Sequence, residues 1–299
     1  MNRPGRVALH GGGEFRPGDE PFLRVILAAA ASAAHARIAA AARPRIAAAV
    51  APAAGAPPPD LAPPPWARGR PEDDPAAVRI VLLPTAAAGE RPEMAVAFGS
   101  AALRRVAAEA GITVSIEAAM VVDASSAGAP QEASRLAGAD LIYLPGGDPG
   151  RLAAILPASP AWRAVLAAHA RGAVVAGASA GAMILAAWTW TATGGAAGLG
   201  LVPGIVVVPH AERVAEHGWT ETFARRVQPG LRPLGALGLE ERTGIVSEPA
   251  DERDGEPADE RDEPPVVWRV VGPGRVHWTP PGKRTIHGFR DGDTLSLGG

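Results

Sequence analysis

A serine flanked by glycines is the first feature of this sequence that could do chemistry. Residues 177–181 read Gly-Ala-Ser-Ala-Gly, after a β-branched stretch and before an apolar, helix-forming one. In a sharp strand-to-helix turn, small flanking residues allow close backbone approach and leave the serine hydroxyl exposed. The pattern predicts a nucleophile elbow with Ser179 as nucleophile and the Ala180 amide near the developing negative charge. The alternative is a tight turn in which Ser179 only caps the following helix.

A nucleophilic serine needs a base, and the base needs an orienting acid. His210 directly follows the strand-like stretch 204–209, so we expect it at a strand's carboxyl end, where open α/β sheets build their sites. His217 would join it in a metal pair, but no third ligand has convincing spacing, and neither a metal nor another cofactor is predicted. His277 and His287 are the alternative bases if the chain order is that of an α/β-hydrolase esterase, with serine, acid and then histidine.

Two carboxylates are candidates for the acid. Glu240 and Glu241 stand between two apolar pieces of the segment 237–246, again near an expected strand end. Neighbouring residues of a strand point to opposite faces, so only one of the two is expected to reach the base. The sequence leaves open whether Glu240 or Glu241 is the acid.

A second glycine-rich loop follows another strand-like stretch. In the segment 143–152, Gly146, Gly147 and Asp148 come between an apolar run and a helix-forming run. Backbone amides of such a loop are able to approach a ligand or an oxyanion. The alternative is an ordinary glycine-rich turn.

The elements that must position these residues alternate along the chain. Short runs of Val, Ile and Leu alternate with longer alanine-rich segments, which is typical of a parallel sheet covered by helices on both faces. A covering helix is expected over 93–110, and the C-terminal stretches 266–278 and 294–297 are expected as antiparallel strands that close the sheet. The predicted strands are 6–10, 78–84, 112–117, 139–145, 173–177 and 204–209.

Two stretches interrupt this rhythm within what we expect to be one α/β hydrolytic domain, residues 1–299. Residues 43–75 contain too many prolines for a helix or a central strand and are predicted as a surface insertion of polyproline character. Residues 248–254 recur as 256–262, and this polar duplication predicts a solvated acidic loop at about 247–264.

Composition limits the classes of partner. Twenty-nine basic residues are balanced by 31 acidic ones with no basic cluster, so no nucleic-acid partner is expected, and the lack of cysteine excludes thiol nucleophiles. The apolar stretch 25–36 resembles a signal peptide only faintly and is shorter than a membrane span. We expect a cytoplasmic protein without a membrane partner; a homodimer is left open.

Six motifs together carry a resemblance to a known family. The chain resembles the cyanophycinase and dipeptidase E family of serine peptidases, on the stretches 9–14 (LHGGGE), 83–88 (LPTAAA), 144–149 (LPGGDP), 176–183 (AGASAGAM), 206–210 (VVVPH) and 237–244 (LGLEERTG). The resemblance implies a fold like that of class I glutamine amidotransferases, a three-layer α/β/α sandwich. It implies Ser179 as nucleophile, His210 as base and Glu241 as acid. The amides of Gly147 and Ala180 would then hold the oxyanion, with Gly146 and Asp148 beside them.

The sequence departs from the family pattern at two of these motifs. Pro149 stands where cyanophycinase-like members carry glutamine, and Ala211 stands where an aromatic residue is usual. The family's preference for aspartyl substrates implies an acidic group on the acyl side, for which Arg151, Arg213 and Arg242 are candidate partners. The expected function is a serine peptidase that cleaves short peptides through an acyl-enzyme. The alternatives are an α/β-hydrolase esterase and a catalytically inactive small-molecule binding protein.

Overall fold

A computed structural model of the chain describes residues 4–49, 74, 76–215, 234–248 and 266–297. The strands are β1 (Val7–His10), β2 (Val78–Leu82), β3 (Val114–Ala118), β4 (Leu141–Leu144), β5 (Val174–Ala178), β6 (Ala186–Thr191), β7 (Gly194–Ala197), β8 (Val202–Pro209), β9 (Gly235–Leu239), β10 (Gly244–Glu248), β11 (Val267–Val271), β12 (Val276–Thr279), β13 (His287–Phe289) and β14 (Thr294–Ser296). The helices are α1 (Glu20–Ala49), the short 3-10 helix η3 (Thr85–Ala87), α2 (Pro92–Glu109), α3 (Ala124–Gly128), α4 (Pro130–Ala137), α5 (Pro149–Ile155), α6 (Pro160–Ala170), α7 (Ala180–Leu185) and α8 (Ala211–Ala215).

The larger sheet has eight strands in the order β14-β11-β10-β1-β5-β4-β2-β3. All pairings from β1 through β5, β4 and β2 to β3 are parallel, whereas β10, β11 and β14 join antiparallel at the other edge. The expected α/β class, with a mostly parallel central sheet and antiparallel C-terminal strands, is confirmed.

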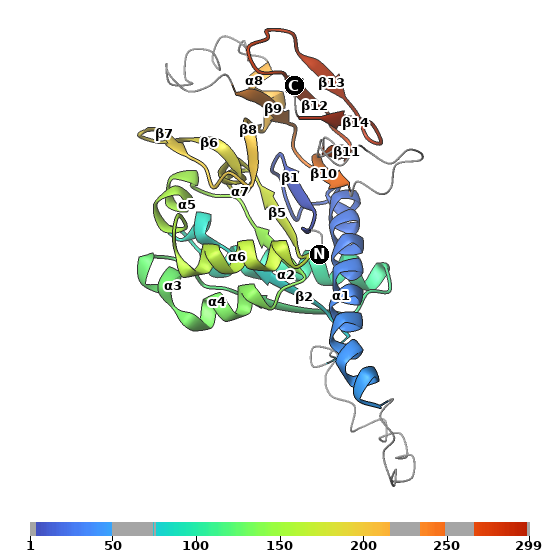
Figure 1. Cartoon of the computed structure of the whole chain (residues 1–299). Coiled ribbons are helices and arrows are strands. Elements are labelled where there is room, and N and C mark those ends of the chain that lie inside the picture. The colour runs from blue at the N-terminus through green and yellow to red at the C-terminus, as the bar shows by residue number, and fades with distance from the viewer. Residues whose placement is uncertain (1–3, 50–73, 75, 216–233, 249–265, 298–299) are drawn as a thin grey trace, which may run out of the picture.

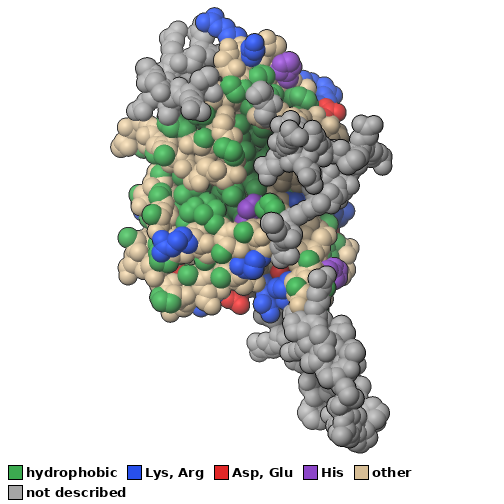
Figure 2. Space-filling view, in the orientation of Figure 1, with side chains coloured by type: hydrophobic (Ala, Val, Ile, Leu, Met, Phe, Trp, Pro, Cys, Tyr) green, Lys and Arg blue, Asp and Glu red, His purple; other side chains and the backbone are tan. Residues whose placement is uncertain are grey.

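Helices cover both faces of this sheet and complete a three-layer sandwich (Figure 1). On one face, α1 and α2 pack through Phe22, Ile26 and Leu103, all fully buried. On the other face, α4 and α6 pack through Leu136 and Val165, which are also fully buried. On the face shown in Figure 2, apolar side chains gather across the middle of the molecule, and Lys and Arg side chains are spread out rather than clustered. Burial of apolar side chains on both faces is the main force that holds the layers together.

A second sheet of six strands, in the order β13-β12-β9-β8-β6-β7, lies against the carboxyl end of the first. The strand predicted at 204–209 belongs to this sheet, where β8 is parallel to both β6 and β9. The C-terminal strands do not all close one sheet, because β11 and β14 join the central sheet while β12 and β13 join the second. Leu237 and Val276 of the second sheet share a core with Ile245 of the central sheet.

Helix α1 is longer than the sequence indicated. It runs to Ala49 and so includes residues 43–49, the start of the stretch predicted as an insertion. Alanine-rich sequence on both sides of Pro44 favours helix enough to extend it past the proline. By length and composition Glu20–Ala40 would suffice to cross a membrane, yet Phe22 and other apolar side chains of this stretch are buried against the central sheet.

Most of the two irregular stretches falls outside the described residues. This applies to 50–73 of the proline-rich stretch and to 249–265, which contains most of the duplication. Ser247 and Glu248, the first residues of the expected acidic loop, are the last two residues of β10. The predictions for the remainder of both stretches stay predictions.

The connection from β1 to α1 is held in shape by a buried pair of polar side chains. His10 and Asp19 are 0% and 1% exposed, and His10 Nε2 lies 2.9 Å from Asp19 Oδ1. The other carboxylate oxygen accepts the Phe15 N–H at 2.8 Å, and His10 Nδ1 accepts the Gly12 N–H at 3.3 Å. Because Nδ1 is an acceptor, the imidazole proton is on Nε2, the ring nitrogen nearest to Asp19, although the angle between the two groups is not that of a hydrogen bond. The pair therefore closes residues 11–19 into a compact loop.

We predict that Asp19→Asn destabilises the protein by about 1 to 3 kcal/mol. An amide has one oxygen and no charge, so its NH₂ group must lie against either the His10 Nε2–H or the Phe15 N–H, and two buried donors then face each other. Chemical denaturation of both proteins measures the loss. Glu109→Gln is the control, because Glu109 pairs with Arg24 at the exposed surface, and it should cost less than about 1 kcal/mol. Equal losses for the two variants would contradict a special role of the buried pair.

Candidate active site

Ser179 occupies the turn between β5 and α7, as predicted from the glycine pattern. Its backbone has φ 48° and ψ −114°, a sparsely populated conformation for a residue with a side chain. The two glycines are required by contact distances. A Cβ at Gly177 would lie 2.4 Å from the Gly181 carbonyl oxygen, and a Cβ at Gly181 would lie 2.1 Å from the Leu144 carbonyl oxygen. Ser179 makes no side-chain capping bond to α7, so the capping alternative does not describe this turn.

Three side chains from three loops meet at this turn. Ser179 Oγ lies 3.1 Å from His210 Nε2, and His210 Nδ1 lies 2.8 Å from Glu241 Oε1. His210 directly follows β8, and Glu241 lies in the turn from β9 to β10. The structure therefore brings together the serine, the histidine and the second of the two glutamates that the sequence singled out.

The Glu241 carboxylate fixes the imidazole tautomer. A carboxylate only accepts hydrogen bonds, so the His210 Nδ1–H donates to Glu241 and the Nε2 lone pair faces Ser179. Burial alone would raise the pKa of Glu241. The hydrogen bond from His210 and the charges of Arg213, His210 and Arg16 outweigh burial and hold this pKa below its ordinary value. Glu241 is therefore ionised at neutral pH.

The β1–α1 connection holds all three loops through backbone hydrogen bonds. The His10 carbonyl accepts the Ser179 N–H at 2.9 Å, and the Gly11 carbonyl accepts the His210 N–H at 2.9 Å. The Gly12 carbonyl accepts the N–H of Arg242, the neighbour of Glu241, at 2.8 Å. Gly12 also requires the absence of a side chain, since a Cβ there would lie 2.3 Å from His210 Cε1.

Backbone strain gathers at the same place. Five described residues other than glycine have positive φ, and four of them belong to this site or its supporting loop. They are Phe15 (65°), Ser179 (48°), His210 (51°) and Arg242 (59°). Such conformations cost about 1 to 3 kcal/mol each and persist only where the surrounding structure enforces them. The backbone bonds from the β1–α1 connection supply that enforcement.

The expected oxyanion residues lie around Ser179 with different bonding partners. Ala180 is the first residue of α7, so its N–H has no partner within the helix. The Gly146 N–H donates to Glu14 Oε1 at 2.8 Å. The Asp148 carboxylate caps α5 by accepting the Gly150 N–H at 2.8 Å. In the described part of the chain, no backbone hydrogen bond uses the Gly147 amide, and Gly147 lies against Ala86.

Pro149 and Ala211 stand at helix starts. Pro149 is the first residue of α5, where a fixed φ and a missing N–H are tolerated. Ala211 is the fully buried first residue of α8 and packs near Ala236.

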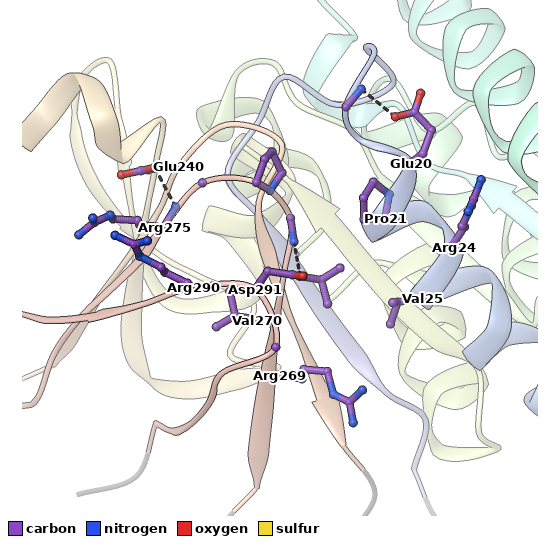
Figure 3. Close-up of a pocket in the computed structure, with 16 residues that line it drawn as sticks. Glu20, Pro21, Arg24, Val25, Glu240, Arg269, Val270, Arg275, Arg290 and Asp291 are labelled. Carbon is purple, nitrogen blue, oxygen red and sulfur yellow. Dashed lines mark hydrogen bonds between the residues drawn. The ribbon is translucent and has the colours of Figure 1, made fainter.

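Glu240 faces away from the triad. Glu240 Oε1 lies 3.0 Å from His277 Nε2, and its Oε2 accepts the Arg275 N–H at 2.8 Å. Glu240 lines a separate cavity of about 1300 Å³ that neither Ser179 nor His210 lines. Figure 3 shows Glu240, Arg275 and Arg290 on one side of this cavity and residues from the start of α1 on the other. The second histidine–glutamate pair is therefore distinct from the first.

The three arginines that were candidates for a substrate carboxylate have other neighbours. Arg213 Nη2 donates to Glu241 Oε1 at 2.5 Å. Arg151 Nε lies 4.0 Å from the Asp148 carboxylate, and the Arg242 side chain lies against Gly18. Arg213 thus pairs with the Glu241 carboxylate rather than standing free for a substrate.

His210, Glu212 and Glu241 also have ligand-type atoms within 4.8 Å of one another. A metal ion there would have to displace the bonds that Glu241 accepts from His210 and Arg213. The cluster is therefore better described as a hydrogen-bonded triad with Glu212 beside it. Glu212 Oε2 accepts the Glu241 N–H at 3.1 Å. The metal pair of His210 with His217 lies outside the described residues, because 216–233 are not described.

Comparison with known protein families shows to which family the chain belongs. The model of peptidase family S51 matches residues 73–248, more than half of the chain and all three residues of the triad. The chain belongs to peptidase family S51. This membership confirms the resemblance drawn from the six motifs and supports a serine peptidase.

One solved structure shows the same fold as this S51 member, and a second aligns less closely. A peptidase from an acI-B1 Actinobacterium aligns with a TM-score of 0.61 and 21% identity, over 98% of this chain and 97% of that one. A putative peptidase E protein from Listeria monocytogenes EGD-e aligns with a TM-score of 0.46 and 16% identity, over 81% of this chain and 94% of that one. No curated protein matches the sequence significantly.

Sequence reasoning did not single out the residues that support the triad. Glu14 was only the last letter of a quoted motif, and His10 received no role. The sequence does contain a signal for both residues. His10 and Glu14 flank three glycines directly after a strand-like stretch, and such a pattern indicates a loop that lies at a functional site. The partners of these residues, Gly146 and Asp19, cannot be read from spacing, because they depend on tertiary contact.

The lowered pKa of Glu241 predicts how its contribution to stability depends on pH. A folded-state pKa below the ordinary 4.5 means that the stabilisation is fully present above 4.5 and is lost as pH falls through the folded-state value. The difference in unfolding free energy between wild type and Glu241→Gln should therefore be larger at about pH 5 than at about pH 3. Urea unfolding at these two pH values measures it, with the exposed Glu90→Gln as control. A difference that grows from about pH 5 to about pH 3 would contradict the prediction.

Proposed function

We propose that this S51 member is a serine peptidase that cleaves an amide bond in short peptides through an acyl-enzyme on Ser179. The observation that supports this most is the continuous chain from Ser179 Oγ to His210 Nε2 at 3.1 Å and from His210 Nδ1 to Glu241 Oε1 at 2.8 Å. A serine hydroxyl is a poor nucleophile unless such a base removes its proton.

In the proposed acylation step, Ser179 Oγ attacks the carbonyl carbon of the peptide bond and passes its proton to His210 Nε2. The imidazolium that forms is stabilised by ionised Glu241. The amides of Gly147 and Ala180 donate to the oxyanion, which is the role that the family resemblance assigns to them. Collapse of the intermediate breaks the carbon–nitrogen bond, and His210 gives the proton to the leaving amine.

In the proposed deacylation step, a water molecule gives its proton to His210 Nε2 and attacks the ester on Ser179. Return of that proton to Ser179 Oγ releases the acid and restores the enzyme. Arg213 beside Glu241 helps keep the acid ionised through both steps.

The rival α/β-hydrolase order requires a C-terminal base. His277 lies against Glu240, and His287 is exposed on β13. In the described part of the chain, neither makes a hydrogen bond to Ser179, which favours His210.

Several further expectations belong to this proposal. We propose a single domain whose substrate is a small peptide, without a nucleic-acid or membrane partner, in the cytoplasm. The burial of one face of α1 in the core supports a structural role for the only apolar segment long enough to span a membrane among the described residues. A homodimer stays open as an alternative to a monomer.

The two histidine–glutamate pairs provide a matched test. His210→Ala should lower kcat by at least about 1000-fold, because Ser179 loses its base, and Glu241→Gln should cost less, because nucleophile and base stay in place. His277→Ala and Glu240→Gln remove the equivalent side chains of the second pair and should stay within about threefold of wild type. Hydrolysis of a dipeptide panel measures the rates, and circular dichroism checks that each variant is folded.

A folded His210→Ala variant that keeps near-normal hydrolysis while His277→Ala or His287→Ala is inactive would move the site to the α/β-hydrolase order. Failure of a fluorophosphonate to label Ser179 in the wild-type protein would favour the inactive binding protein, since labelling requires an activated hydroxyl.

A further inference from the structure

The cavity next to the start of α1 has no part in the proposed mechanism. Its volume is about 1300 Å³, and no residue of the triad lines it. Residues from the start of α1 line one side, and Arg275 and Arg290 line the other (Figure 3). Pockets that hold small molecules measure about 300 to 1,000 Å³, so this cavity has room for one.

The strand register places Arg275 and Arg290, the arginine pair of this cavity, opposite each other. Strands β12 and β13 are antiparallel, with Val276 opposite Phe289. One residue further along this register, Arg275 just before β12 lies opposite Arg290 just after β13. Directly opposite residues carry their side chains on the same face, with Cβ atoms about 4.5 to 5.5 Å apart, and like charges in this arrangement are destabilising.

The two guanidinium groups of the arginine pair lack a partner among the described residues. Within that part of the chain, neither group takes part in an ion pair or a hydrogen bond. Glu240, which is paired with Arg275 across the sheet, gives one carboxylate oxygen to His277 and the other to the Arg275 backbone N–H. Asp291 accepts a backbone N–H from the turn before β12. The nearby acids therefore hold other groups.

The remaining charged side chains of the cavity are already paired. Arg24 pairs with Glu109 of α2, and Arg269 pairs with Glu248 of β10. Glu20 pairs with an arginine of α2. Among the described residues, the cavity thus presents two positive charges without a contacting acid, and both belong to the arginine pair.

A phosphate group fits such a pair better than a carboxylate does. Above its second pKa of about 6, a phosphate monoester carries two negative charges and three acceptor oxygens. These oxygens are enough for paired N–H donors from two guanidinium groups, whereas a carboxylate has one charge and two oxygens. Pro21, Val25 and Pro273 also line the cavity and offer apolar contact to an organic group attached to the phosphate.

We infer that this cavity is a second binding site, for a phosphate monoester of a small organic molecule. The phosphate lies between the guanidinium groups of Arg275 and Arg290 and relieves their repulsion, and the organic group lies against the apolar side chains. The inference goes beyond the proposed peptidase and does not rest on it, because the cavity and the triad share no residue.

The test measures the binding of small probes to the full chain by isothermal titration calorimetry at about pH 8, where a phosphate monoester is a dianion. Phenyl phosphate is the main probe. Benzoate carries the same ring with a single charge, and inorganic phosphate lacks the ring. Thermal unfolding without any probe checks that each variant is folded.

The wild-type protein should bind phenyl phosphate at least about ten times more tightly than benzoate, and more tightly than inorganic phosphate. Arg275→Gln and Arg290→Gln should each weaken phenyl phosphate binding about 10- to 100-fold, because charge-assisted hydrogen bonds are lost. Arg290→Lys keeps the charge and should lose less affinity. Arg213→Gln, which removes the guanidinium group beside the triad, is the matched control and should keep the wild-type affinity.

Without a probe, Arg290→Gln should melt at no lower temperature than wild type, since it removes one of two opposed like charges. Three results would overturn the inference. One is a wild-type protein that binds phenyl phosphate no more tightly than benzoate. Another is binding that is lost in Arg213→Gln but kept in both glutamine variants of the arginine pair, which would place the probe at the triad. The third is an equal loss in Arg290→Gln and Arg290→Lys, which would mean that the charge has no part in binding.

Discussion

The arrangement of this molecule depends on the short connection between β1 and α1. Carbonyl groups of His10, Gly11 and Gly12 accept backbone N–H groups from the three loops that carry Ser179, His210 and Glu241. These loops come from widely separated parts of the chain and from two different sheets, so side-chain contacts alone would not fix their relative positions. Hydrogen bonds to one rigid loop do so, because each bond sets both a distance and a direction.

The rigidity of that connection has its own cause in the core. The buried His10–Asp19 pair closes the loop from within, and the ring of His10 lies 4.5 Å from that of Phe22 on α1. Apolar packing of α1 against the central sheet thus supports the loop, and the loop supports the site. Packing of the hydrophobic layers stabilises α1 against the central sheet, and the His10–Asp19 pair fixes the conformation of the loop that holds the triad.

Much of the fold and of the candidate site was predictable from sequence. The features that were not predictable depend on contacts between residues far apart in the chain. Hydrophobic runs located the central strands, and the glycines at 177 and 181 located the turn at Ser179, because these signals are local. The division of strands between two sheets was not predictable, since β8 has the same β-branched composition as a central strand. Which glutamate meets His210 was left open by the residues alone and was indicated only by the family resemblance. The partners of His10 and Glu14 depend on tertiary contact and leave no pattern along the chain.

The left-handed backbone at Ser179, His210 and Arg242 has a consequence for how such a chain tolerates change. Glycine adopts these angles without the steric cost that a side chain adds, so the backbone at each of the three positions carries strain that glycine would relieve. If the side chains at these turns were not needed for activity, replacing them with glycine would relieve this strain. Because the proposed chemistry needs the side chains of Ser179 and His210, stability and activity compete at this site rather than in the core.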